Sequence, residues 1–93
     1  MYLFVITNIM NLILNSIDLG AKLRAERKAR HVTQAWVAAR VGCRRQTIAD
    51  LEAGRNVAVA VLLGVVSSLG KALAIVDARV ELEQLGEIFH GED

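Results

Sequence analysis

Side chains that commonly carry out catalysis or bind metals are few and scattered in this sequence. It contains one cysteine, Cys43, and two histidines, His31 and His90. A metal site with four ligands would need carboxylates, and no nucleophile forms a convincing constellation with either histidine. A glycine-rich phosphate loop is also missing. We therefore expect neither an enzyme nor a bound cofactor.

Basic side chains, in contrast, are concentrated in one part of the chain. Residues 19–55 hold nine lysines and arginines against three acidic residues, a net charge near +6. Residues 77–93 hold six acidic residues against one arginine, near −5, although the whole chain carries only +1. The basic body predicts a polyanionic partner. The acidic tail predicts a basic partner, competition with phosphate, or simply a solvated end.

Length and composition indicate a single globular domain. The chain has 93 residues, of which 54% are hydrophobic and 23% are charged. That is enough for one core but not for two, and too apolar for a disordered chain. A single cysteine excludes a disulfide framework and suits a reducing compartment, so we expect a cytoplasmic protein.

Residues 1–17 are nearly all apolar and could be mistaken for a leader or an anchor. The first basic residue is Lys22, whereas a secretory signal begins with basic residues, and the run is short for a membrane span. Packing onto the body or onto a dimer mate, a disordered or artefactual extension, and membrane contact stay open as alternatives. We expect no membrane partner.

The apolar spacing predicts helices over residues 18–30, 34–41, about 44–53 and 57–70. Ser16 or Asp18 can cap the first of them and Thr33 the second. Glu26 and Arg30 are spaced for an ion pair on the first helix. Gly42 stands where a left-handed residue must end the second. Two short helices joined by a glycine-containing turn are the helix-turn-helix arrangement.

The region after residue 56 predicts self-association. The helix over 57–70 is apolar almost all round, which indicates burial on more than one side. Residues 72–80 suit a strand, and a lone strand needs a mate, which its twin across a two-fold axis would supply. Residues 81–90 could add a short acidic helix. We therefore expect a homodimer.

A combined pattern over residues 19–56 carries a family resemblance. Its members are Arg27, Thr33, Gln34, Ala38, Gly42, Gln46, Thr47, Ile48, Leu51, Glu52, Ala53 and Gly54. Together they strongly resemble the Cro/repressor-type (XRE) helix-turn-helix family, over about residues 19–70. Residues 62–76 are similar to its HipB-like subgroup, in which a strand after the last helix forms an intersubunit sheet. Many members of that subgroup are antitoxins that bind a toxin and repress their own operon.

The resemblance implies that the second helix of the motif enters the major groove of double-stranded DNA. Arginine there reads guanine and glutamine reads adenine. Gln34 would meet a phosphate at the start of the preceding helix, and Arg55 and Asn56 would reach the backbone after the recognition helix. The implied DNA-contacting residues are Gln34, Arg44, Arg45, Gln46, Thr47, Asp50, Arg55 and Asn56.

Two further implications concern acidic side chains. Asp50 could accept a hydrogen bond from cytosine, or it could pair with a basic neighbour such as Arg45; both alternatives stay open. Arg27 and Glu52 match a family pair that forms an internal ion pair and ties the first helix to the recognition helix.

Three residues depart from the family pattern. Arg44 stands where a serine or threonine often caps the recognition helix, so this helix would start less firmly, or Arg44 would serve a phosphate. Cys43 occupies a small apolar turn position, where packing or redox sensing are the alternatives. Trp36 replaces a polar, exposed residue and therefore needs a partner, with residues 1–17 as the nearest candidate and another protein as the next.

We therefore predict an all-α protein with a four- to five-helix repressor-like domain and a C-terminal strand that pairs across a dimer. The predicted parts are an apolar extension (1–17), the DNA-binding domain (18–72) and a strand with an acidic tail (73–93). The predicted function is sequence-specific regulation of transcription by a dimeric repressor on a palindromic operator. The alternative is an antitoxin that neutralises a protein toxin and autoregulates its operon.

Overall fold

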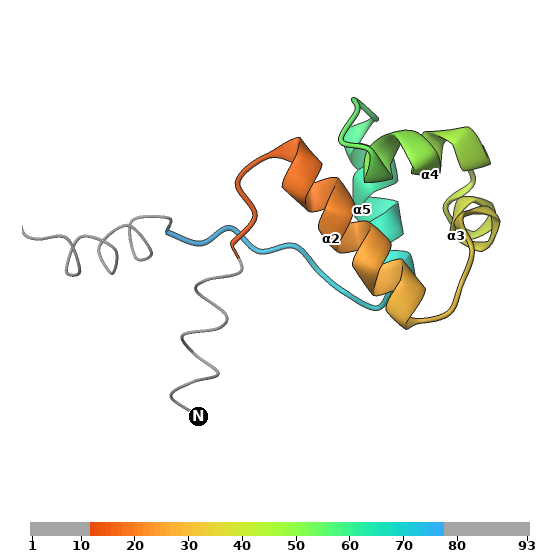
Figure 1. The fold of residues 1–93 in the computed structure, drawn as a ribbon, viewed down its shortest axis with the longest axis horizontal. Coiled ribbons are helices and arrows are strands. Elements are labelled where there is room, and N and C mark those ends of the chain that lie inside the picture. The colour runs from red at the N-terminus through yellow and green to blue at the C-terminus, as the bar shows by residue number, and fades with distance from the viewer. Residues whose placement is uncertain (1–11, 78–93) are drawn as a thin grey trace, which may run out of the picture. The chain divides into compact units, whose positions relative to one another are not determined.

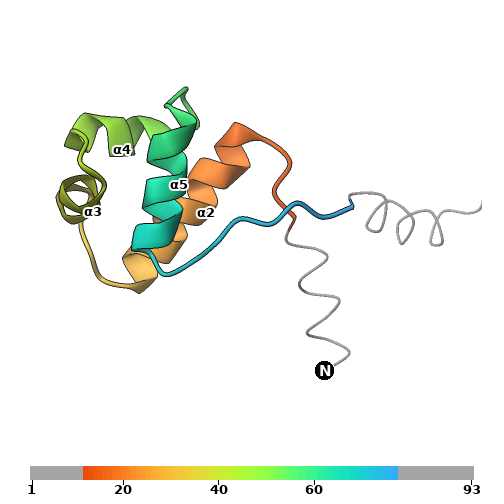
Figure 2. The same cartoon turned by 180° about the vertical axis from the view of Figure 1, so that it is seen from behind.

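A computed structural model describes residues 12–77, in which four α-helices surround a small core (Figure 1). The helices are α2 (Ser16–Ala29), α3 (Gln34–Val41), α4 (Arg45–Glu52) and α5 (Val59–Ser68). Seen from behind, α5 crosses in front of α2, while α3 and α4 lie together to one side (Figure 2). The four predicted helices are confirmed, with ends that differ from the predicted ones by at most two residues.

The starts of α2 and α3 are set by side chains that accept hydrogen bonds from the first turn. Asn15 caps α2, because its side chain accepts from the Asp18 backbone nitrogen; the predicted caps Ser16 and Asp18 were wrong by one and three residues. Thr33 caps α3 as predicted, and its Oγ1 accepts from the Trp36 nitrogen at 3.0 Å. Each cap satisfies a backbone donor that the helix itself leaves unpaired.

The turn between α3 and α4 depends on Gly42. Its φ of 86° lies in the left-handed region, which an L side chain adopts only at a cost. Its nitrogen and that of Cys43 both donate to the Ala38 carbonyl, which closes the last turn of α3. The chain then re-enters a helix at Arg45, so that α3 and α4 form a helix-turn-helix.

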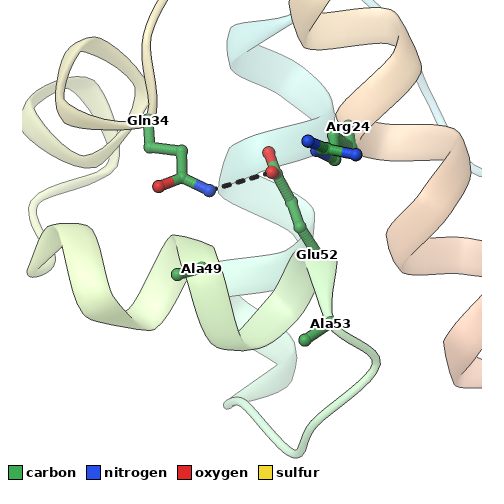
Figure 3. Close-up of a pocket in the computed structure, with 5 residues that line it drawn as sticks. All are labelled: Arg24, Gln34, Ala49, Glu52 and Ala53. Atoms are coloured by element: carbon green, nitrogen blue, oxygen red, sulfur yellow. Dashed lines mark hydrogen bonds between the residues drawn. The ribbon is translucent and has the colours of Figure 1, made fainter.

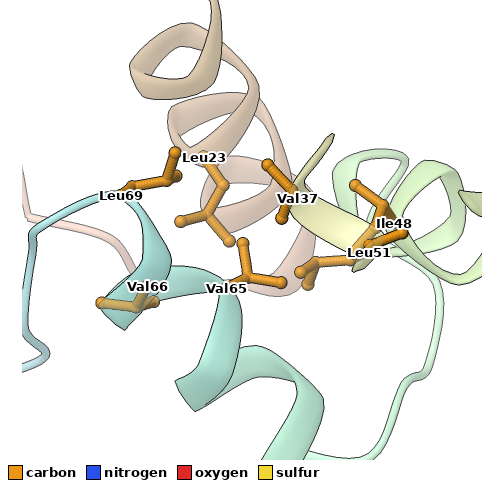
Figure 4. Close-up of a cluster of buried hydrophobic side chains, with 8 residues drawn as sticks. Leu23, Val37, Ile48, Leu51, Val65, Val66 and Leu69 are labelled. Atoms are coloured by element: carbon orange, nitrogen blue, oxygen red, sulfur yellow. The ribbon is translucent and has the colours of Figure 1, made fainter. Parts of the chain in front are cut away.

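The core takes at least one buried side chain from each of the four helices (Figure 4). Its members are Leu23, Val37, Ala38, Ile48, Leu51, Val65, Val66 and Leu69. Ile48 and Leu51 point inward from α4 as predicted, and their spacing of three residues gives that helix a narrow buried stripe. Cys43 is half-buried and packs against the edge of this core.

Helix α2 approaches α4 closely at Gly20. A Cβ atom at this position would collide with the backbone carbonyl oxygen of Leu51 and would lie 2.6 Å from that of Glu52. Both atoms are backbone and cannot rotate away, so only glycine permits this separation of the two helices. The close approach brings α2 side chains next to the end of α4.

Several predictions fall wholly or partly outside residues 12–77. Most of the N-terminal extension, the end of the predicted strand and the acidic helix over 81–90 lie outside the described residues. Residues 71–77 form neither helix nor strand, so the strand over 72–80 is not shown in the part that is described. The predicted Glu26–Arg30 pair is replaced, because Glu26 instead binds Lys22 and Lys71 at 3.3 and 3.4 Å.

Among the described helices, none combines the length and the apolar character that crossing a membrane requires.

Candidate nucleic-acid interface

The outer face of α4 carries the side chains predicted to read bases. Arg45 and Gln46 are exposed at the start of the helix, and Gln46 lies opposite the stripe formed by Ile48 and Leu51. Arg44 precedes the helix in extended conformation and makes no side-chain capping bond, as expected for arginine in that place. The start of α4, together with Arg44 before it, therefore presents three basic or amide side chains to solvent.

A buried ion pair ties α2 to the end of α4. Arg27 Nε lies 2.7 Å from Glu52 Oε2, and Arg27 Nη2 donates to Glu52 Oε1 at 3.1 Å, so the pair is bidentate. The two side chains are only 11% and 5% exposed. Arg27 also donates to the Val32 carbonyl, which holds the loop after α2. The structure thus brings together the two residues that the family resemblance paired.

Gln34 connects this pair to Arg45 at the start of α4. Its Nε2 donates to Glu52 Oε1 at 3.0 Å, and its Oε1 accepts from Arg45 Nη1 at 2.7 Å. Both ends of the amide are therefore fixed, one by an acceptor and the other by a donor. In this free state the side chain of Gln34 links Arg45 to the buried ion pair.

Asp50 pairs with Gln46 and Arg55 rather than with Arg45. A single oxygen, Oδ1, accepts from Gln46 Nε2 and from Arg55 Nη1, each at 3.0 Å. The hydrogen bond from Gln46 lowers the pKa of Asp50, partial desolvation opposes this, and Arg55 lowers the pKa further. Asp50 is therefore ionised at neutral pH.

A shallow pocket of about 270 Å³ lies where α2, α3 and α4 meet, and Arg24 is one of the residues that line it. Figure 3 shows Arg24 on α2 and Gln34 at the start of α3 on either side of Glu52. Arg24 is exposed. Arg24 is not among the DNA-contacting residues that the family resemblance implies. Its spacing of three residues from Arg27 is the signal that would have found it, because that spacing places both on one helix face.

The remaining predicted contact residues are arranged less specifically. Asn56 is exposed just after Arg55, and Thr47 is half-buried in the first turn of α4. His31 is an exposed loop residue with a left-handed φ of 60°. Trp36 is 40% exposed, and the Arg40 guanidinium lies 4.9 Å from its ring centroid. Its predicted cover by residues 1–17 depends largely on residues outside the described range.

The comparisons with known proteins agree with this geometry. A family model described as a helix-turn-helix domain matches residues 18–85, which is more than half of the chain. No curated protein matches the chain. The matched range includes α3, the turn at Gly42 and α4, with Arg45 and Gln46 on the outer face. The chain therefore belongs to the helix-turn-helix domain family and is a DNA-binding protein.

Proposed function

We propose that this protein is a sequence-specific transcriptional regulator of the Cro/repressor (XRE) type, acting in the cytoplasm as a dimeric repressor on a palindromic operator. It acts by binding and not by catalysis. The observation that carries the proposal is the exposed pair Arg45 and Gln46 in the first turn of α4, with Gln46 on the face opposite the core stripe. A helix placed in the major groove by its N-terminal end presents such side chains to base edges.

Contacts to the DNA phosphates would flank the base contacts of Arg45 and Gln46. Arg24 and the start of α3 border one side of α4, and Arg55 and Asn56 follow its end. Phosphates lie on both sides of the groove that a recognition helix enters, so both groups can bind them. Arg24 is a contact that we add to those predicted from the sequence.

Dimer formation is supported by the apolar face that α5 leaves uncovered in the single chain. Val59 and Leu63 are 68% and 50% exposed and lie one turn apart, although α5 also buries Val65 and Val66. A second copy would cover this face and allow residues 72–80 to pair as strands, as in the HipB-like subgroup. Two-fold symmetry then places the two α4 helices on half-sites about 10 base pairs apart or a multiple of that.

The proposal is tested by selecting bound duplexes from a random pool and titrating variants against the selected operator and a scrambled duplex. Gln46→Ala should cost about 1–3 kcal/mol on the operator and relax preference at one base per half-site. Arg24→Ala and Arg55→Ala should weaken both duplexes alike and reduce the salt slope by about one per lost phosphate contact. Equal weakening of both duplexes by Gln46→Ala would contradict the groove assignment.

A second candidate function is neutralisation of a protein toxin, in which DNA binding would regulate the protein's own operon. The exposed Trp36, with Arg40 against its ring, favours it, because tryptophan and arginine dominate the energetic centres of protein interfaces. A toxin-like reading frame beside the gene would favour this function. Trp36→Ala should then abolish rescue from the co-expressed toxin while operator binding is retained.

A further inference from the structure

One carboxylate oxygen of Asp50 binds both Gln46, which is predicted to contact a base, and Arg55, which is predicted to contact the DNA backbone. Gln46 comes from the first turn of α4, and Arg55 from the segment after it, and both donate to Oδ1 at 3.0 Å. The Asp50 side chain is 32% exposed and that of Arg55 is 68% exposed. The link therefore lies at the surface that the proposed function places against DNA.

We propose that Asp50 is a specificity-determining residue that suppresses non-specific DNA binding without contacting a base. This inference rests on the proposed function. In the free protein Arg55 is held by a carboxylate, so a phosphate must compete with that carboxylate for the guanidinium. The negative charge of Asp50 also repels the phosphates of any duplex. Both effects weaken every duplex, whatever its sequence.

On the operator, a base contact made by Gln46 offsets the loss of affinity that Asp50 causes. The Gln46 amide has two Nε2 hydrogens, and Asp50 accepts only one of them. The other hydrogen and Oε1 remain free for the two-point contact that glutamine makes with adenine. Asp50 thus holds the amide in place for a matching base while it holds Arg55 away from phosphate. With a scrambled duplex, Asp50 still repels the phosphates, but Gln46 makes no matching base contact to offset this repulsion.

Two substitutions separate the charge from the hydrogen bond. Asp50→Asn removes the charge but keeps a carbonyl oxygen that can accept from Gln46, whereas Asp50→Ala removes both. Glu26→Gln is the matched control, since it changes the net charge by the same amount on α2, where Glu26 pairs with Lys22 and Lys71. Circular dichroism melts of all variants check that each is folded.

The experiment titrates the full-length protein and the three variants against the selected operator and a scrambled duplex at several salt concentrations. Both Asp50 variants should bind the scrambled duplex about two- to five-fold more tightly per half-site than Glu26→Gln does, a size typical of an exposed ion pair. The gain should shrink at high salt. Asp50→Asn should keep the base preference at the Gln46 position, and Asp50→Ala should relax it.

Three results would overturn the inference. If the Asp50 variants behave like Glu26→Gln, only the net charge of the chain matters. If they lose operator affinity and leave the scrambled duplex unchanged, Asp50 contacts a base directly. If the wild type selects no preferred duplex at all, the proposed function fails and the inference fails with it; the first two results leave the proposed function intact.

Discussion

The Glu52 carboxylate receives three hydrogen bonds from two other helices. Arg27 on α2 donates twice and Gln34 at the start of α3 donates once, so the end of α4 is fixed against both. A buried charge of this kind is tolerated because its partner neutralises it, and it becomes costly when the partner is removed. The pair therefore serves orientation as much as stability.

Removing one member of this pair should destabilise the domain strongly. Glu52→Gln leaves the Arg27 charge nearly buried without its counter-ion, which should lower the free energy of unfolding by about 3–5 kcal/mol in urea titration. The double variant Arg27→Met/Glu52→Leu should recover most of the loss, because apolar replacement of both partners leaves no buried charge. The exposed pair of Lys22 and Glu26 is the control, and a Glu52→Gln loss as small as that of Lys22→Ala would contradict this account.

The Asp50 carboxyl group offers a residue-scale test that does not require DNA. Because the Gln46 hydrogen bond is the main cause of its lowered pKa, Gln46→Ala should move the pKa back toward the ordinary value of 3.8. A group whose pKa is lower in the folded state than in the unfolded state stabilises the fold at pH values above the unfolded-state pKa. This contribution is lost as the pH falls through the folded-state pKa. Carboxyl-carbon NMR titration measures the shift, with Arg55→Ala as the comparison, and an unchanged midpoint in Gln46→Ala would contradict the assignment.

At the scale of the residue, family position identified the Arg27–Glu52 pair, whereas helical spacing alone predicted a Glu26–Arg30 pair that the structure replaces. Capping and turn patterns were more reliable. Thr33 and Gly42 belong to local motifs of three or four residues, and the structure confirms both. Asn15 was missed because three polar residues, Asn15, Ser16 and Asp18, can each cap a helix, and only the start of the helix decides between them. Of the two partners of Asp50, Gln46 lies four residues before it on α4, whereas Arg55 depends on the path of the chain after α4, which no local pattern fixes.

Three of the four described helices end in the same way. After α2, α4 and α5 the backbone nitrogens of the second and third residues beyond the helix donate back to carbonyls of its last turn, and the second residue is left-handed. Gly54 and Gly70 fill this place after α4 and α5, whereas His31 fills it after α2 at φ 60°. A side chain with a Cβ is strained there, so α2 ends with a cost that the other two helices avoid.

Substitutions at two left-handed positions, Gly42 after α3 and His31 after α2, should measure this backbone strain in opposite directions. Gly42→Ala should lower the free energy of unfolding by about 1–2 kcal/mol, because the new Cβ meets nothing within 4 Å and only the backbone conformation opposes it. His31→Gly should raise the free energy of unfolding by about 1 kcal/mol or less, since the gain in backbone freedom of the unfolded chain offsets part of the relief. Thermal melts measure both, and destabilisation by His31→Gly would show that the His31 side chain contributes more than its strain costs.

Across the whole molecule, the structure confirms the four predicted helices, whereas the predictions for residues 1–11 and 78–93 lie outside the described residues. The periodic apolar residues of α2 to α5 pack into one core, and this core is complete within a single chain. The predicted strand over 72–80 differs, because a strand gains its hydrogen bonds only from another strand, and residues 12–77 of a single chain contain none. The exposed apolar face of α5 is where a second chain would have to contribute.

The last prediction concerns that face. If α5 forms the dimer interface, Leu63→Glu should place two like charges in it and convert the dimer to monomers of 10.1 kDa, measured by light scattering at micromolar concentration. Each monomer should remain folded, because Leu63 is 50% exposed in the single chain and its loss removes little from the core. The same variant should then bind one half-site but lose most of its affinity for the palindrome, since the second α4 is no longer tethered to the first. Trp36→Glu is the control, because Trp36 is a large apolar side chain on α3 that is 40% exposed, and this variant should remain dimeric. A Leu63→Glu dimer would place the interface elsewhere, and a wild-type monomer would remove the reason for expecting a palindromic operator.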